Sequence, residues 1–383
     1  MKTLIKLLIF FVLSICLFNQ NIFASEKIKI GLIIPLSGEN SLIGKKIIKS
    51  TRMAINKIND HRIEIIPKDT KSNPIDALKV SKELYKEGVR IVIGPVFNES
   101  TKYLDDLKEI TFISLTNKLI DNPGNVISAG VNAISQLQTI KKFNKKNNLS
   151  QSIFLIPRSQ FKREIEEAIK KTKIKHKEIF YYDREPTKLT KQIEDLTKYQ
   201  IRKNNLKYEI KRLESLSFKD KERKIENLKK KDTLGNISFD SVIIADFDEN
   251  LKSVATSLLY TDVSPKRIFY ITLNQWFDES LLKENSLHPI YFPSINKNNY
   301  ELFMSEFKNA YGLDGDQLSF LSYDLVGLVY FLIYENDFQV SKKIFYKKNK
   351  FKGKIGIFEI NKNTITHQLN FYSIEDETFK SIF

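Results

Sequence analysis

Short apolar runs alternate with segments of helical periodicity through the first third of the chain. Residues 28–36 form a continuous apolar run, as expected for a strand covered on both faces, and from Ile43 apolar residues recur at helical spacing. The pattern continues with predicted strands at 63–67, 89–93 and 111–115 and predicted helices at 75–86 and 101–108. This order of elements predicts a parallel, doubly wound sheet.

A second cycle of the same kind follows. It comprises predicted strands at 152–156, 176–182, 241–245 and 267–273 and helices at 161–171 and 251–259, before closing helices at 300–311 and 318–334 and strand-like segments at 356–360 and 367–372. The fold class is therefore α/β, with two Rossmann-like lobes. We expect one lobe to comprise 26–132 and 294–350, and the other 133–293 and 351–383.

A charged segment, 188–232, interrupts the second cycle. It contains 15 Lys and Arg against 8 Asp and Glu, and its apolar residues recur at steps of three and four, which makes a narrow apolar seam. A break at 217–220 predicts a helical hairpin that projects from the second lobe and is separable from it. Two interpretations remain open: a solvated insertion, or an arm that binds a partner.

The N-terminus resembles a secretory signal peptide. Two lysines precede an apolar run of about 12 residues, which is too short to span a bilayer, where about 20 are needed, and cleavage is expected near Ala24. We therefore predict a signal peptide at 1–25, export and no membrane span. Residues 13–16, which end at Cys16, resemble a lipoprotein cleavage box, but Ile15 stands where that box needs a small residue, so we expect no lipidation.

Composition excludes several classes of function. The 383 residues carry a formal net charge of +16, but the excess of Lys, Ile and Asn runs through the whole chain, and export further weakens the case for a nucleic-acid partner. A single Cys and four dispersed His residues provide no metal site and no disulfide framework. No catalytic motif is present. We predict a protein that is not an enzyme, has no cofactor and is a monomer.

Polar turns follow many of the predicted strands. They lie at 37–40, 98–101, 114–117, 159–160, Asp246 and 274–276. Ligands bind beyond the carboxyl ends of strands in open α/β sheets, although Ser, Thr and Asn at such junctions are commonly helix caps. As candidate ligand-binding residues we take Ser37, Asn98, Ser100, Ser114, Thr116, Asp246 and Trp276. Trp276, the only tryptophan, either stacks on a ligand or packs under the hinge.

Several segments together carry a family resemblance. Residues 30–38, Gly44, 69–77, 91–95 and 112–114 resemble the type I periplasmic binding proteins of the Leu/Ile/Val-binding kind. Later segments, at 240–246, 274–278, 322–324 and 351–358, look more like the penicillin-binding protein activators, which share that fold. The resemblance implies two lobes crossed three times by the chain, with a cleft that closes on ligand by hinge motion.

The resemblance also implies where a ligand would sit. Asn98 stands where amino-acid receptors offer a hydroxyl to the ligand carboxylate, and Phe161 stands where the second lobe usually provides a tyrosine, which makes Phe161 a further candidate. The acidic residue expected near Asn274 for a ligand ammonium group is missing. An amino-acid pocket is therefore in doubt, although another small polar ligand is not excluded.

Two functions follow from the resemblance, both in the periplasm. The first is a solute receptor that passes a small polar, amino-acid-like ligand to an ABC-type permease. The second is a penicillin-binding protein activator, which regulates peptidoglycan synthesis by contact with a cell-wall synthase. The polar turns favour the first function, whereas the altered pocket, the hairpin and the C-terminal segments favour the second.

Overall fold

The computed structural model describes residues 27–383, so the predicted signal peptide and Cys16 lie outside the described residues. The first lobe is built on a parallel five-stranded sheet of order β2-β1-β3-β4-β5. Its strands are β1 (Ile28–Ile34), β2 (Ile63–Asp69), β3 (Ile91–Ile93), β4 (Thr111–Ser114) and β5 (Val126–Ser128), and its early helices are α2 (Ser41–Ile58) and α3 (Pro74–Lys86). The apolar runs of the sequence therefore become the buried strands of this sheet.

The second lobe is built on a seven-stranded sheet of order β15-β14-β10-β9-β8-β6-β7. The strands are β6 (Ser152–Pro157), β7 (Glu178–Tyr182), β8 (Ser241–Ile244), β9 (Phe269–Thr272), β10 (Ile290–Ser294), β14 (Asn370–Glu375) and β15 (Thr378–Ser381). Strands β6 to β10 are parallel, whereas β14 runs antiparallel to β10 and β15 antiparallel to β14. Helices α4 (Ala133–Lys146), α5 (Lys162–Thr172), α6 (Pro186–Thr197) and α9 (Asp248–Tyr260) belong to this lobe. The α/β class with two Rossmann-like lobes is thus confirmed.

The helix predicted at 101–108 is wrong. Two short 3-10 helices, η1 (Asn98–Thr101) and η2 (Leu104–Asp106), occupy this region. Leu104 and Leu107 are the only aliphatic side chains of 101–108, and Tyr103 is exposed, so the apolar face is too short to offset the cost of nucleating an α-helix. Three further 3-10 helices are η3 (Glu279–Lys283), η4 (Asn285–Leu287) and η5 (Lys342–Phe345).

The C-terminal region divides between two sheets. Strands β11 (Asn349–Lys352), β12 (Ile357–Asn361) and β13 (Thr364–Gln368) form an antiparallel sheet of their own, whereas β14 joins the second lobe. The strand predicted at 367–372 is therefore two strands in different sheets. The strand-like segment 356–360, which we expected in the second lobe, pairs with neither lobe's sheet but lies in this third sheet. The predicted division into two lobes did not include a third sheet.

Helices α10 (Lys297–Tyr311) and α11 (Gln317–Tyr334) return the chain to the first lobe. Helix α11 is long and apolar enough to cross a membrane, but most of it is buried inside the protein. It packs against α2, where the Ser50 hydroxyl donates to the carbonyl oxygen of Ser319 at 2.5 Å. The apolarity of α11 is therefore that of a core helix.

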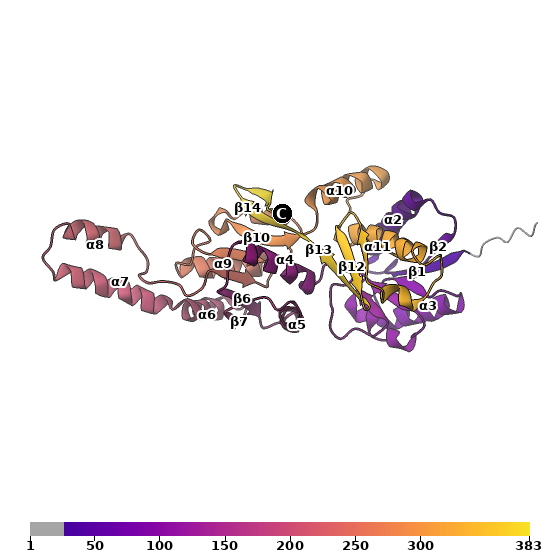
Figure 1. The fold of residues 1–383 in the computed structure, drawn as a ribbon, viewed down its shortest axis with the longest axis horizontal. Coiled ribbons are helices and arrows are strands. Elements are labelled where there is room, and N and C mark those ends of the chain that lie inside the picture. Colours follow the sequence, from indigo (N-terminus) through magenta and orange to yellow (C-terminus); the bar gives the residue numbers. More distant parts are fainter. Residues whose placement is uncertain (1–26) are drawn as a thin grey trace, which may run out of the picture.

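The charged insertion begins later than predicted. Helix α6, which covers the start of the predicted hairpin, packs against α9, and its Leu189 and Ile193 side chains are fully buried in the core. The projecting part consists of α7 (Tyr199–Glu214) and α8 (Lys221–Lys229), and we call residues 199–232 the arm. Figure 1 shows the arm extending from the second lobe on the side away from the first lobe. The whole segment 188–232 is consequently not separable from the fold, because its first helix fills the core.

Candidate functional site

The first polar turn is organised by an aspartate at the end of β2. The Ser37 hydroxyl donates to Asp69 Oδ2 at 2.5 Å, and the backbone N–H of Leu36 donates to Oδ1 at 2.8 Å. Burial raises the pKa of Asp69, but these hydrogen bonds and one from the N–H of Lys71 outweigh it and hold the pKa below its usual value. The Ser37 side chain is thus engaged within the chain.

The turns after β3 and β4 lie deeper. The Ser114 hydroxyl donates to the carbonyl oxygen of Pro95 at 2.8 Å, and Thr116 Oγ1 accepts the N–H of Lys118 at 3.2 Å. By contrast, Asn98 Oδ1 and the hydroxyl of Ser100 are buried and find no hydrogen-bond partner among residues 27–383. Ser114 and Thr116 therefore brace their loops, while Asn98 and Ser100 retain unused hydrogen-bonding capacity.

Asp246 follows β8 and is almost fully buried, but its carboxylate is engaged. It accepts the Tyr182 hydroxyl at 2.7 Å and two hydrogen bonds from the Arg184 guanidinium at 2.7 and 3.0 Å, and the N–H of Phe247 also donates to it at 3.0 Å. Burial, together with the neighbouring Asp246, raises the pKa of Tyr182 well above its usual range. The hydrogen bonds that Arg184 donates to Asp246 raise the pKa of Arg184. Four donors leave this carboxylate little capacity for a ligand.

The two aromatic candidates occupy different surroundings. Phe161 precedes α5 and is exposed, whereas Trp276 is half-buried with its ring 6.5 Å from that of Tyr300 at the start of α10. The backbone N–H of Trp276 donates to Asn274 Oδ1, and the buried Asn274 Nδ2 has no partner within the described part of the chain. The structure therefore shows Trp276 packed at the connection between β10 and α10.

The helix-cap interpretation fails for the first turn, because the side chain of Asn40 before α2 makes no capping hydrogen bond. In two later turns a polar side chain accepts a backbone N–H group close to a helix start: Ser159 Oγ accepts that of Phe161 at 3.3 Å, and Asp246 Oδ1 accepts that of Phe247 at 3.0 Å. A genuine cap is Asn132, whose Oδ1 accepts the N–H of Ser135 at 3.0 Å.

A carboxylate of the second lobe reaches the first lobe. Glu164, on α5, accepts the backbone N–H groups of Leu119 and Ile120 at 3.1 to 3.2 Å, and it is only 8% exposed. Beside it, Arg163 forms an ion pair with Asp121 at 2.9 Å. We call Glu164 with Leu119 and Ile120 the latch. No local pattern marks Glu164 in the sequence, because its partners lie about 45 residues away on the loop between β4 and β5.

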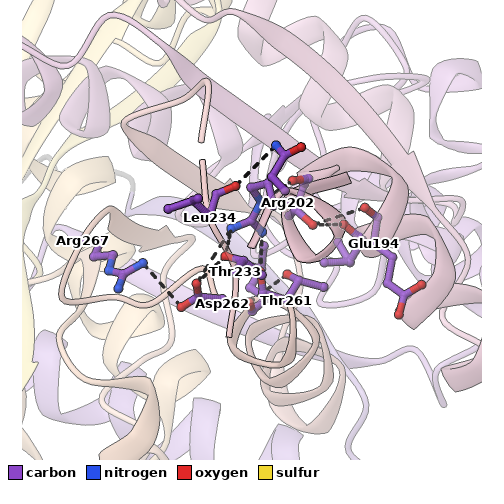
Figure 2. A network of polar contacts seen from close by, with 11 residues as sticks. Glu194, Arg202, Thr233, Leu234, Thr261, Asp262 and Arg267 are labelled. Carbon is purple, nitrogen blue, oxygen red and sulfur yellow. Dashed lines mark hydrogen bonds and ion pairs between the residues drawn. The ribbon is translucent and has the colours of Figure 1, made fainter. Parts of the chain in front are cut away.

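The arm is held at its base by a buried arginine, shown in Figure 2. Arg202 donates to the carbonyl oxygens of Thr197 and Thr261 and to the Thr233 hydroxyl, with distances of 2.9, 2.5 and 2.9 Å. Its guanidinium also lies 4.0 Å from Asp262, and burial lowers its pKa. These partners come from the end of α6, from the loop that returns out of the arm and from the residues just after α9. Arg202 therefore ties both ends of the arm to the second lobe.

The arm has a narrow buried seam and an exposed, mostly basic surface. Leu206, Leu213 and Ile225 are buried between α7 and α8, whereas Ile201 and Tyr208 are 59% and 71% exposed. The arm contains twelve Lys and Arg but six Asp and Glu. One side of α7 thus presents two apolar side chains, seven residues apart, among positive charges.

Comparisons with known proteins identify the fold. A sequence model described as periplasmic binding protein matches residues 27–178. No curated protein matches the sequence at a significant level. Among solved structures, the C-domain of LpoA from Haemophilus influenzae, a regulator of PBP1A, is similar at 12% identity and a TM-score of 0.62, with 93% of this chain and 100% of that chain covered.

Two solute-binding structures are also similar. A putative branched-chain amino acid ABC transporter from Rhodospirillum rubrum has 12% identity and a TM-score of 0.70, over 93% of this chain and 100% of the other. The substrate-binding protein LivJ from Streptococcus pneumoniae, in complex with isoleucine, has 15% identity and a TM-score of 0.52, over 93% and 99%. The resemblance to the type I periplasmic binding proteins is therefore confirmed, and the chain has their two-lobed fold.

Proposed function

We propose that this protein acts in the periplasm by contact with another protein, as a regulator of a cell-wall synthase, and has no catalytic role. The observation that carries the proposal is the internal engagement of two carboxylates, one in a predicted ligand-binding turn and one at the contact between the lobes. Asp246 is satisfied by Tyr182 and Arg184, and Glu164 bridges to the first lobe through the latch. The similarity to LpoA, a regulator of PBP1A, suggests the kind of partner.

The arm is the proposed contact element. Its base is fixed by Arg202, so that little ordering entropy would be lost when a partner binds. Ile201 and Tyr208 offer apolar contact area, and tyrosine is frequent among the residues that dominate interface energetics. The surrounding lysines favour a partner surface with an apolar groove rimmed by acidic side chains.

Replacing Ile201 and Tyr208 together by serine is expected to weaken binding to a penicillin-binding protein of the source organism at least tenfold, about 1.4 kcal/mol. The measurement is fluorescence anisotropy with the labelled, full-length protein. Exposed side chains of the same type elsewhere, Leu302 and Tyr334, provide the matched control pair L302S/Y334S. Equal affinity of I201S/Y208S and the control pair would reject the arm as the contact element.

A solute receptor is the second candidate, and one observation favours it. Asn98 Oδ1, the Ser100 hydroxyl and Asn274 Nδ2 lie in the predicted ligand-binding turns and lack partners. Buried polar groups are normally satisfied, so a bound molecule would account for them. Because Asp246 is already engaged by Arg184, an uncharged polar ligand fits better than an amino acid.

Thermal-shift screening separates the two functions. A receptor at a hundredfold excess of ligand over Kd gains about 2.7 kcal/mol, which raises the melting temperature by a few degrees. For a contact regulator, we expect no shift with amino acids, short peptides, sugars or nucleosides. A shift that disappears in the double variant N98A/S100A would establish the receptor function and overturn our proposal.

A further inference from the structure

A cavity of about 510 Å³ opens at the end of the second lobe, away from the cleft. Four lysines contribute to its lining, namely Lys141, Lys145, Lys173 and Lys175, together with the apolar Leu149 and Ile174 and the polar Asn144, Asn148 and Ser150. No acidic residue lines it. The volume lies within the range of small-molecule sites.

The positive charge around this cavity is not balanced within the chain. Between residues 141 and 177, nine exposed lysines form no ion pair with any carboxylate that the structure describes; they are Lys141, Lys142, Lys145, Lys146, Lys170, Lys171, Lys173, Lys175 and Lys177. Elsewhere many lysines do pair, for example Lys354 with Glu306 at 2.6 Å. The cavity therefore lies in a region of excess positive charge, although the Asp240 carboxylate is hydrogen-bonded to its lining residue Ser150.

Helix stabilisation explains only part of this arrangement. Lysines in the last turn of a helix interact favourably with its negative end, and Lys145 is in the last turn of α4. Lys173 and Lys175, however, lie beyond the end of α5, in the loop before β7. Lys141 has a structural task, because its Nζ donates to the carbonyl oxygen of Thr172 at 2.8 Å and joins α4 to α5.

We propose that this cavity is a binding site for a phosphate group carried on a small polyol, either as a free metabolite or as a lipid headgroup. Lysine ammonium groups are point charges that can surround a tetrahedral phosphate, whereas planar carboxylates are better recognised by the arginine fork, and no arginine lines the cavity. Asn148 and Ser150 also line the cavity, and amide and hydroxyl side chains can hydrogen-bond the hydroxyl groups of a polyol. The Oδ1 atom of the buried Asn144 also has no partner.

The site is separate from the cleft and adjacent to the base of the arm. The cavity loops precede β6 and β7, so they lie at the edge of the sheet opposite the polar turns. Asp240, just after the arm, accepts the N–H groups of Ser150 and Gln151 at 2.8 and 2.9 Å. A ligand here would therefore neutralise charge beside the arm without entering the cleft.

The test uses the chain without the predicted signal peptide, residues 26–383, and two probes. Glycerol 3-phosphate binding is measured by calorimetry, and binding to phosphatidylcholine vesicles containing phosphatidylglycerol is measured by co-sedimentation. The variant K145Q/K173Q/K175Q leaves the structural Lys141 intact and is expected to weaken binding at least tenfold. The control K79Q/K82Q/K86Q removes the same charge from exposed lysines of α3 in the first lobe and should leave affinity within twofold of wild type.

The outcomes are distinct. A free metabolite is supported if K145Q/K173Q/K175Q, but not the control variant, loses binding to glycerol 3-phosphate. A lipid headgroup is supported if K145Q/K173Q/K175Q loses binding to the vesicles but not to glycerol 3-phosphate. Equal weakening by both triple variants would show that only the overall charge matters and would overturn the site. Absence of binding to either probe by the wild-type protein would overturn it as well.

Discussion

Replacing Arg202 by alanine is expected to lower the free energy of unfolding of the second lobe by about 3 to 5 kcal/mol. The substitution leaves the buried carbonyl oxygens of Thr197 and Thr261 without the guanidinium that donates to them. Asp262 loses one of its two arginine neighbours and keeps its ion pair with Arg267 at 3.4 Å. Unpaired buried polar groups cost more than the hydrogen bonds themselves contribute. Urea denaturation followed by circular dichroism measures the change.

Arg212 provides the matched control on the same helix. Its guanidinium pairs with Glu209 at 2.7 Å on the exposed surface of α7, so Arg212→Ala should cost less than about 1 kcal/mol. A similar, small loss in both variants would contradict the anchoring role of Arg202. In that case the arm would be held mainly by its apolar seam.

Two buried groups at the connections between the lobes should give opposite pH dependences. His367 is fully buried, and its Nε2 lies 2.8 Å from the carbonyl oxygen of Ala129; burial lowers its pKa from 6.5 to about 4. The unfolded chain therefore binds more protons than the native protein between these values. The free energy of unfolding should fall as the pH decreases from 6.5 to 4, by about 3 kcal/mol for this group.

Asp324 acts in the other direction. Its carboxylate accepts the N–H groups of Lys354 and Ile355 at 2.9 and 2.6 Å and is almost completely buried on α11. Burial raises its pKa from 3.8 to about 6, although the two hydrogen bonds oppose the shift. Because the native protein binds more protons here, the free energy of unfolding should fall by about 3 kcal/mol as the pH rises from 3.8 to 6.

The two contributions nearly cancel in the wild type, and single substitutions should reveal them. Relative to wild type, His367→Gln should gain stability as the pH falls from 6.5 to 4, while Asp324→Asn should lose it. Urea denaturation at half-unit pH steps gives both difference curves. The same exchanges at the exposed His61 and Asp337, H61Q and D337N, are measured alongside for comparison. Flat difference curves for H367Q and D324N would contradict both assignments.

Local pattern determined most of the strands and the main helices. Apolar runs such as 28–36 and 152–156 became buried parallel strands, because a strand covered on both faces has no polar side. The helix at 101–108 failed for lack of an apolar face. The third sheet was missed because 367–372 reads as one strand, and only pairing with two different neighbours divides it between β13 and β14.

The candidate site divides in the same way. Sequence pattern located the polar turns at the strand ends, since strand polarity alone places them at one edge of a sheet. Sequence pattern could not show that Arg184 donates hydrogen bonds to the carboxylate of Asp246. Nor could it show that Glu164 bridges the lobes or that Arg202 joins the ends of the arm. Each of these contacts joins residues about 30 to 60 positions apart. Only the packing of separate elements decides whether a polar side chain faces a ligand or another part of the chain.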